Sequence, residues 1–83
     1  SYMKYEYKVT QPLLPPPDKR CNPKSSIMDY QDMTWRINNM FEQGWEFVGH
    51  GTTKLTVSTD QSWWVFKRDK TMFNQHGAIA SYE

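Results

Sequence analysis

The side chains of this 83-residue chain that could ligate a metal or act in catalysis are widely spaced. Cys21, His50 and His76 are residue types that bind zinc, but no two of them stand a few residues apart, as the ligand pairs of zinc motifs do. The acidic residues are scattered, and no serine lies in a nucleophile-elbow sequence. We therefore expect no catalytic, cofactor or metal-binding residues, and predict that the protein is not an enzyme.

One stretch superficially resembles a phosphate-binding loop. This is GHGTTK, from Gly49 to Lys54. It lacks the spacing of such loops and their strand-to-helix context, and it lies within a strand pattern instead. We expect no phosphate site there.

The stretch QSWWVFKR, from Gln61 to Arg68, raises a different question. It has the composition of a strand, and successive side chains of a strand point to opposite faces of the sheet. Trp63 and Trp64 therefore cannot both face one core. A second large indole must be covered by something else, and in a small domain a second subunit is a common solution.

The composition is that of one small domain with its apolar area concentrated in large rings. Aromatic residues make up 16% of the chain, the net charge is +1, and no basic footprint indicates nucleic-acid binding. The single cysteine excludes an internal disulfide and suits a reducing compartment. No signal peptide and no apolar run of about 20 residues is evident. We expect a soluble, cytoplasmic protein without a membrane partner.

The first half of the chain predicts a strand, a loop and a helix. Residues 3–10 alternate, with Met3, Tyr5, Tyr7 and Val9 on the face expected to be half-buried. Residues 11–26 contain all five prolines and form a loop. A helix is expected near 27–43, capped by Ser26 with Asp29 in capping-box position and ended by Gly44. Its predicted apolar stripe consists of Tyr30, Met33, Ile37, Met40 and Phe41.

The second half predicts two strands, near 45–57 and 62–68. In the first, Trp45, Phe47, Leu55 and Val57 share a face with Gly49 and Gly51. An even-numbered hairpin loop would turn Trp64 and Phe66 to that face, and Trp63 and Val65 to the far face beside Lys54. An odd-numbered loop would exchange the two tryptophans.

These elements predict an α+β fold of the β-α-β-β type. The tryptophan strand is the most apolar on both faces, so we place it in the middle of a three-stranded antiparallel sheet of order 1-3-2. One helix packs on one face. The domain is expected to span 3–68, with a tail at 69–83. The predicted core contains Tyr5, Tyr7, Ile37, Phe41, Trp45, Phe47 and Phe66.

Three motifs carry a family resemblance. These are MKYEYKV at the start, FEQGWEFV where helix meets strand, and WVFKR at the end of the third strand. Together they resemble a family of small bacterial and bacteriophage domains of unknown function with the pattern EYKV, E-x-G-W-E-[LF]-V and VFKR. The match spans Met3 to Arg68. The resemblance implies a β-α-β-β fold, similar to dodecins in outline, and no established activity.

The uncovered aromatic face leads to the functional prediction. We expect a non-enzymatic protein-interaction module, with a homodimer favoured and a bacterial protein as a further partner; kinship with phage domains implies inhibition of a bacterial process as a special case. The alternative is a binder of small nucleotide-like ligands or single-stranded nucleic acid, by stacking and Lys or Arg charge. The predicted interface residues are Trp63, Val65, Trp35, Lys54 and Phe73.

Overall fold

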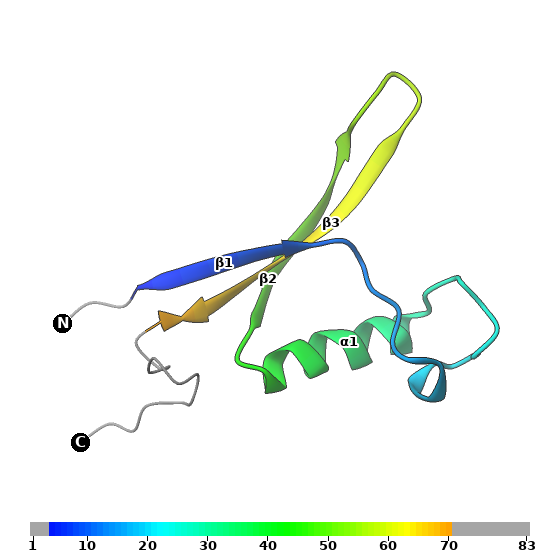
Figure 1. The fold of residues 1–83 in the computed structure, drawn as a ribbon, viewed down its shortest axis with the longest axis horizontal. Coiled ribbons are helices and arrows are strands. Elements are labelled where there is room, and N and C mark those ends of the chain that lie inside the picture. The colour runs from blue at the N-terminus through cyan, green and yellow to red at the C-terminus, as the bar shows by residue number, and fades with distance from the viewer. Residues whose placement is uncertain (1–3, 71–83) are drawn as a thin grey trace.

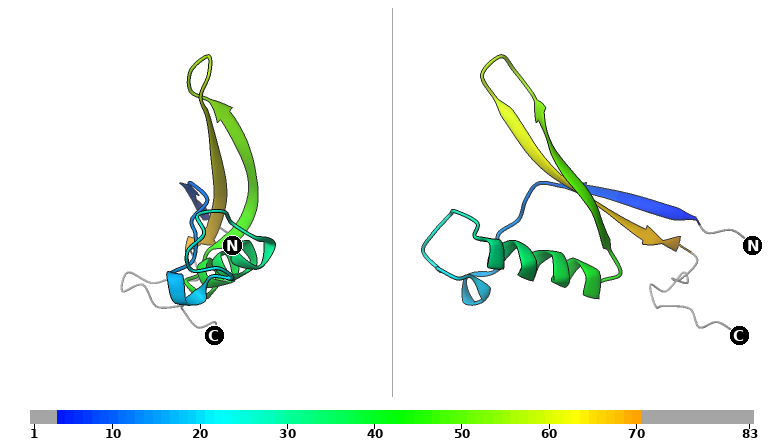
Figure 2. Two further views of the ribbon diagram at one scale, coloured as in Figure 1. Left: turned by 90° about the vertical axis from the view of Figure 1, so that its right-hand side faces the viewer. Right: turned by 180° about the vertical axis from the view of Figure 1, so that it is seen from behind.

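The computed structural model describes residues 4–70. Its order is strand β1 (Tyr5–Thr10), a 3-10 turn η1 (Pro17–Lys19), helix α1 (Tyr30–Glu42), strand β2 (Glu46–Lys54) and strand β3 (Asp60–Asp69). The three strands form one antiparallel sheet of order β1-β3-β2 (Figure 1). The predicted α+β class, β-α-β-β order and central tryptophan strand are confirmed, and α1 lies against one side of the sheet (Figure 2).

The helix begins later than predicted. Its N-cap is Asp29, not Ser26. The Asp29 side chain accepts a bond from the main chain of Asp32, and the Asp32 carboxylate accepts the Asp29 N–H at 3.0 Å, so the two aspartates form the capping box. In the described part of the chain, no helix is long and apolar enough to cross a membrane.

The helix ends as Gly44 predicts. Gly44 has φ of 94°, a left-handed conformation that glycine adopts without steric cost. The N–H groups of Gly44 and Trp45 donate to the carbonyls of Phe41 and Met40, both at 2.9 Å. This bonding pattern turns the chain directly into β2 and places Trp45 over the last turn of the helix.

The hairpin between β2 and β3 has an odd-numbered loop, Leu55–Thr59, rather than the predicted even one. Along most of its length Gly51 therefore opposes Trp63 and His50 opposes Trp64. A register shift between Phe47 and Gly49 inserts one residue, so that Phe47 opposes Phe66. Because of this bulge, the Phe47 side chain points to the same face of the sheet as Trp64 and Phe66.

The odd-numbered loop and the bulge together reverse the predicted placement of the glycines and of Lys54. Gly51 lies on the Trp63 face rather than with Phe47, and Lys54, opposite Asp60, lies on the Trp64 face. Leu55 and Val57 belong to the hairpin loop and are exposed. The prediction that they share the helix-covered face is wrong.

The core is smaller than predicted and lies between α1 and the adjacent face of the sheet. Its buried residues are Met40, Trp45, Trp64 and Phe66, with Met28, Met33, Ile37 and Phe47 packed against them. The rings of Phe47, Trp64 and Phe66 meet edge to face, with centroids 5.5 to 6.3 Å apart. Phe41 is 67% exposed and Tyr30 is also exposed, so their predicted placement on the buried stripe is wrong.

The first strand turns its apolar side away from the helix. Lys8 opposes Phe66, whereas Val9 opposes Val65 and Tyr7 opposes Lys67. Directly opposed residues share a face, so Val9, Tyr7 and Tyr5 lie on the face that α1 does not cover. The prediction that Tyr5 and Tyr7 belong to the core is wrong.

The proline-rich loop is tied to the domain by arginine side chains. Arg36 of α1 donates to the carbonyls of Leu13 and Leu14, at 3.2 and 2.6 Å. Arg20 donates to the carbonyl of Pro15 at 2.6 Å, and Pro15 is fully buried. These bonds satisfy carbonyls that lack a secondary-structure partner in this proline-rich stretch.

Candidate functional site

The face of the sheet that α1 leaves uncovered carries a continuous group of large side chains. We call this the open face, and define it by Tyr5, Tyr7, Val9, Trp63 and Val65. Tyr7 and Val9 are 63% and 65% exposed, and Tyr5 is also exposed. Trp63 and Val65 lie on this face as the sequence predicts. β1 adds Val9 together with Tyr5 and Tyr7, the two tyrosines that were predicted to belong to the core.

Trp63 is held in place by β2. Its indole lies across Gly51, the residue that opposes it in the ladder. Its Nε1–H donates to Oγ1 of Thr53 at 2.8 Å. The ring is therefore half-buried and fixed in orientation by the protein's own residues, and its remaining surface faces outward as a rigid contact.

The charges of the open face gather at one end. Lys67 projects beside Tyr5, with its Nζ 4.5 Å from the ring centroid. Glu46 opposes Lys67, and Asp69 opposes Tyr5. One cation with two acidic neighbours makes no positive surface there, and the centre of the face is apolar.

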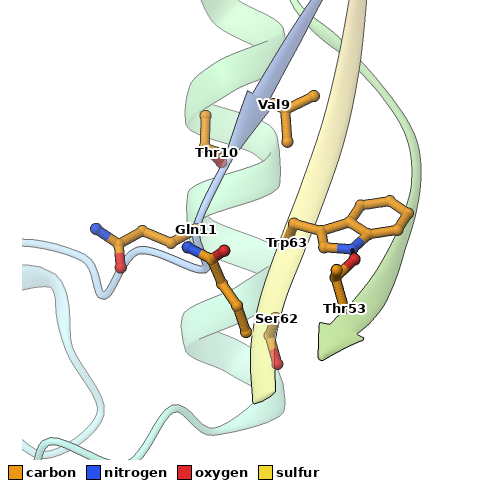
Figure 3. A pocket seen from close by; sticks show the side chains of 7 residues that line it. Val9, Thr10, Gln11, Thr53, Ser62 and Trp63 are labelled. Atoms are coloured by element: carbon orange, nitrogen blue, oxygen red, sulfur yellow. Dashed lines mark hydrogen bonds between the residues drawn. The ribbon is translucent and has the colours of Figure 1, made fainter. Parts of the chain in front are cut away.

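A hollow of about 240 Å³ lies at the other end, where β1 ends beside β3 (Figure 3). Val9, Thr10 and Trp63 line it, and the indole of Trp63 is turned toward Thr53 (Figure 3). Its remaining walls are Gln11, Gln61 and Ser62. All of these side chains are neutral, so the hollow suits an uncharged group.

Two of the predicted interface residues lie elsewhere. Lys54 forms an exposed ion pair with Asp60 at 3.2 Å, on the face of Trp64. Trp35 lies on α1, across the sheet from the open face, with the guanidinium of Arg36 5.2 Å from its ring centroid. Phe73 lies outside the described residues. The structure therefore brings together Trp63 and Val65, and separates them from Lys54 and Trp35.

On the helix side, two cations cover the ring of Trp45. The Arg68 guanidinium carbon lies 4.4 Å from the centroid of this ring, and the Lys8 Nζ lies 5.1 Å from it. Arg68 also donates to the Glu6 carboxylate, with its Nε at 2.8 Å. Through its cation–π contact, Lys8 packs the polar side of β1 against the buried ring of Trp45. This arrangement explains how β1 can turn its tyrosines outward.

Cys21, Asp29 and Asp32 form the group of potential metal ligands found among residues 4–70. Both Asp32 oxygens already accept main-chain bonds, from the N–H groups of Cys21 and Asp29 at 3.0 Å. These bonds lower the pKa of Asp32 below its usual range. Desolvation, followed by the nearby Asp32 and Asp29 carboxylates, raises the pKa of the Cys21 thiol. The group fastens the loop to the helix start.

His50 does not join that group. It lies on β2, where its ring stacks on Phe47 with centroids 6.5 Å apart. His76 lies outside the described residues.

Comparison with protein-family models, curated proteins and solved structures finds no match to this chain. The family resemblance carried by the three motifs therefore stays a prediction.

Proposed function

We propose that the protein is a non-enzymatic protein-interaction module that acts through its open face, and that a second copy of the chain is its first partner. The observation that carries this proposal is the orientation of β1. Tyr5, Tyr7 and Val9 all face away from the only described helix that could cover them. A surface of this kind marks an interaction site in small domains.

The size of the open face supports a weak, reversible association. Each aromatic ring buries about 150–250 Å² when fully covered, and the three rings here are already partly covered. The face alone therefore offers a few hundred Å² per subunit, below the roughly 800 Å² per partner of a standard interface. We therefore expect the average molecular mass in solution to rise with protein concentration in the micromolar range.

The charge on the open face favours a protein over a nucleic acid. Single-stranded nucleic acids bind where aromatic platforms accompany a row of cations that track the phosphates. Here Lys67 is accompanied by Glu46 and Asp69, and the end of the face near Trp63 has neutral neighbours. Within residues 4–70, the open face therefore offers less support to the nucleotide-like ligand and nucleic-acid alternative than to a protein partner.

Light scattering tests the proposal with two matched tyrosine variants. Tyr7→Glu places a charge in the centre of the open face, whereas Tyr30→Glu places one on a tyrosine that is 86% exposed at the start of α1. We expect the wild type and Tyr30→Glu to gain mass between about 10 and 200 µM, and Tyr7→Glu to stay monomeric. A monomeric wild type across this range, or equal masses for both variants, would contradict the proposal.

A further inference from the structure

The two edge strands of the sheet, β1 and β2, differ in regularity. β2 carries the register shift between Phe47 and Gly49, and a bulge of this kind disturbs pairing with a further strand. β1 pairs with β3 from Tyr5 to Thr10 without a shift, and contains neither glycine nor proline. Of the two edges, β1 is therefore the one that a further strand can join over its whole length.

The direction of the main-chain groups of β1 follows from its ladder with β3. Lys70 N–H donates to Lys4 C=O at 2.8 Å, in the register that continues along β1. In an antiparallel ladder every second pair exchanges such bonds, so the even-numbered residues of β1 bond to β3, and the N–H and C=O groups of Tyr7 and Val9 point away from it. Among residues 4–70, β1 has a strand on one side only, so these groups face a vacant edge (Figure 1).

The charged side chains of β1 alternate in sign along one face. Lys4, Glu6 and Lys8 all lie on the face of α1. Both bonds that Glu6 receives from Arg68 fall on its Oε1, so its second carboxylate oxygen can accept a further bond. Lys8 is exposed, and its ammonium group keeps its donors while it lies 5.1 Å from the ring centroid of Trp45. Each of the two central charges can therefore take a partner of opposite sign across the edge.

The β1 strand of a second copy matches these charges in one register. When two β1 strands lie antiparallel with Tyr7 opposite Tyr7, each Glu6 opposes the Lys8 of the other copy. These charges stand at the non-hydrogen-bonded pairs of the new ladder, where side chains approach most closely. The neighbouring registers with the same main-chain alternation set Glu6 opposite Glu6, or Lys8 opposite Lys8, and like charges directly opposite are destabilising. Charge therefore selects the register centred on Tyr7.

The main chain and the apolar side chains fit the same register. The Tyr7 N–H of each copy donates to the Tyr7 C=O of the other, because both groups point to the outer edge. On the open face, Val9 of one copy stands opposite Tyr5 of the other, and pairs of aromatic and β-branched residues stabilise antiparallel sheets. One register thus satisfies the main chain, the charged face and the apolar face.

The other described elements leave this edge accessible. α1 packs mainly against β2, which lies on the other side of β3 from β1. After Thr10 the chain leaves the sheet and runs toward α1, where Arg36 donates to the carbonyls of Leu13 and Leu14 (Figure 2). Neither the helix nor the proline-rich loop therefore lies beside the outer edge of β1.

We propose that two copies of the chain join their β1 edges in antiparallel register, with Tyr7 opposite Tyr7 and Glu6 opposite Lys8, and so merge their two sheets into one. Directly opposed residues share a face, so both helices lie on one side of the merged sheet and the two open faces become continuous. The inference goes beyond the proposed function, because it adds a contact at the edge of the sheet and leaves the open face uncovered. The continuous face has about twice the area of one open face, which approaches the roughly 800 Å² per partner of a standard interface.

Light scattering of two charge-reversal variants of the full chain tests this register. Glu6→Lys sets cations opposite each other across the edge, and Lys8→Glu sets carboxylates opposite each other. Each variant alone should therefore associate about tenfold more weakly than the wild type. In an equal mixture, every such pair between unlike chains joins opposite charges. We expect the mixture to gain mass as the wild type does, between about 10 and 200 µM.

The mixture also controls for damage to the fold. Glu6→Lys loses the bond to Arg68, and Lys8→Glu loses the contact with Trp45, so both variants should melt below the wild type. Mixing restores the charge pairs between copies but none of these contacts within a copy, so a gain of mass on mixing reports the edge alone. A mixture no heavier than the mean of its two components, or equal association of the wild type and both variants, would overturn the inference.

Amide exchange in the ¹⁵N-labelled wild type identifies what occupies the edge. We expect exchange of the Tyr7 and Val9 amides to slow about tenfold as the protein associates. Slow exchange at every concentration would show that the chain covers its own edge, and unchanged exchange while the mass rises would show that copies meet elsewhere; either result overturns the inference.

A variant of Trp63 separates the edge contact from a contact through the open face. Trp63 lies beyond the end of β1, which pairs with β3 only as far as Trp64. Trp63→Ala, introduced into both charge variants, should therefore weaken association through the open face and preserve the gain of mass on mixing. Loss of that gain would overturn the assignment to the edge.

Discussion

The indole of Trp63 occupies the space that a side chain at position 51 would fill. A Cβ built on Gly51 would lie 2.8 Å from Cη2 and 2.9 Å from Cε2 of that ring. Both residues lie on the open face, directly opposite each other in the β2–β3 ladder. The glycine therefore sets how deeply Trp63 lies against β2, and how much of the ring is exposed on the open face.

Replacing this glycine should displace the ring. We expect Gly51→Ala to lower the free energy of unfolding by about 1–3 kcal/mol, because the added methyl group overlaps the indole. It should also shift the indole N–H resonance of Trp63, through loss of the bond to Thr53. Gly49→Ala is the matched control, since its Cβ would meet no atom within 4 Å. Equal unfolding midpoints for the two variants would contradict this relationship.

Two phenylalanines should differ sharply in their contribution to stability. Phe66 is 1% exposed in the centre of the core, whereas Phe41 is 67% exposed on α1. Phe66→Ala should lower the free energy of unfolding by about 3–5 kcal/mol, whereas surface substitutions such as Phe41→Ala stay within about 0.5 kcal/mol. Denaturant titration measures both. A large loss in Phe41→Ala would indicate that this ring is buried in solution.

The Asp32 carboxylate should make stability depend on acid pH. Asp32 is 2% exposed, and its main-chain hydrogen bonds lower its pKa in the folded state. Its contribution is therefore complete above the unfolded value of about 3.9, and is lost as the pH falls through the lower folded value.

Asp32→Asn should accordingly melt below the wild type at pH 6. The two melting temperatures should converge as the pH falls from about 5 to 2, because the wild-type carboxyl then becomes protonated as well. Asp18→Asn, at an exposed residue of η1, is the control. A constant difference between wild type and Asp32→Asn over this range would refute the role of the charge.

Much of the fold could be predicted from local patterns. Gly44 ended the helix as expected, and the apolar character of the tryptophan strand indicated its central place and the burial of Phe66. These features follow from single residues or short periods, which act without knowledge of distant neighbours. The separation of Trp63 from Trp64 followed from strand alternation alone.

The orientation of β1 could not be predicted in this way. Alternation shows that Tyr5 and Tyr7 share a face, but not which face the helix covers. That depends on the register of β1 against β3 and on the cation–π contacts of Lys8 and Arg68 with Trp45, which involve residues far apart in the sequence. The usual expectation that apolar residues face the core gave the wrong side.

The bulge at Val48 could likewise not be predicted from periodicity. Alternation along residues 45–57 placed Gly51 with Phe47. Gly49 and Gly51 indicate a bend or a close approach by another group, but not the position of an inserted residue. The register shift between Phe47 and Gly49 moves Gly51 to the Trp63 face. The odd hairpin loop and the bulge compensate each other, so Trp64 faced the helix although the predicted loop was wrong.

Intermolecular NOEs test the central claim, that a second copy covers the open face, most directly. An equal mixture of ¹³C-labelled and unlabelled protein at about 0.5 mM, above the expected micromolar range, yields signals only between copies. We expect contacts from the methyl groups of Val9 and Val65 to the aromatic protons of Tyr7 and Trp63 across the interface. Intermolecular signals confined to α1 or the hairpin loop, or none at all, would contradict the account.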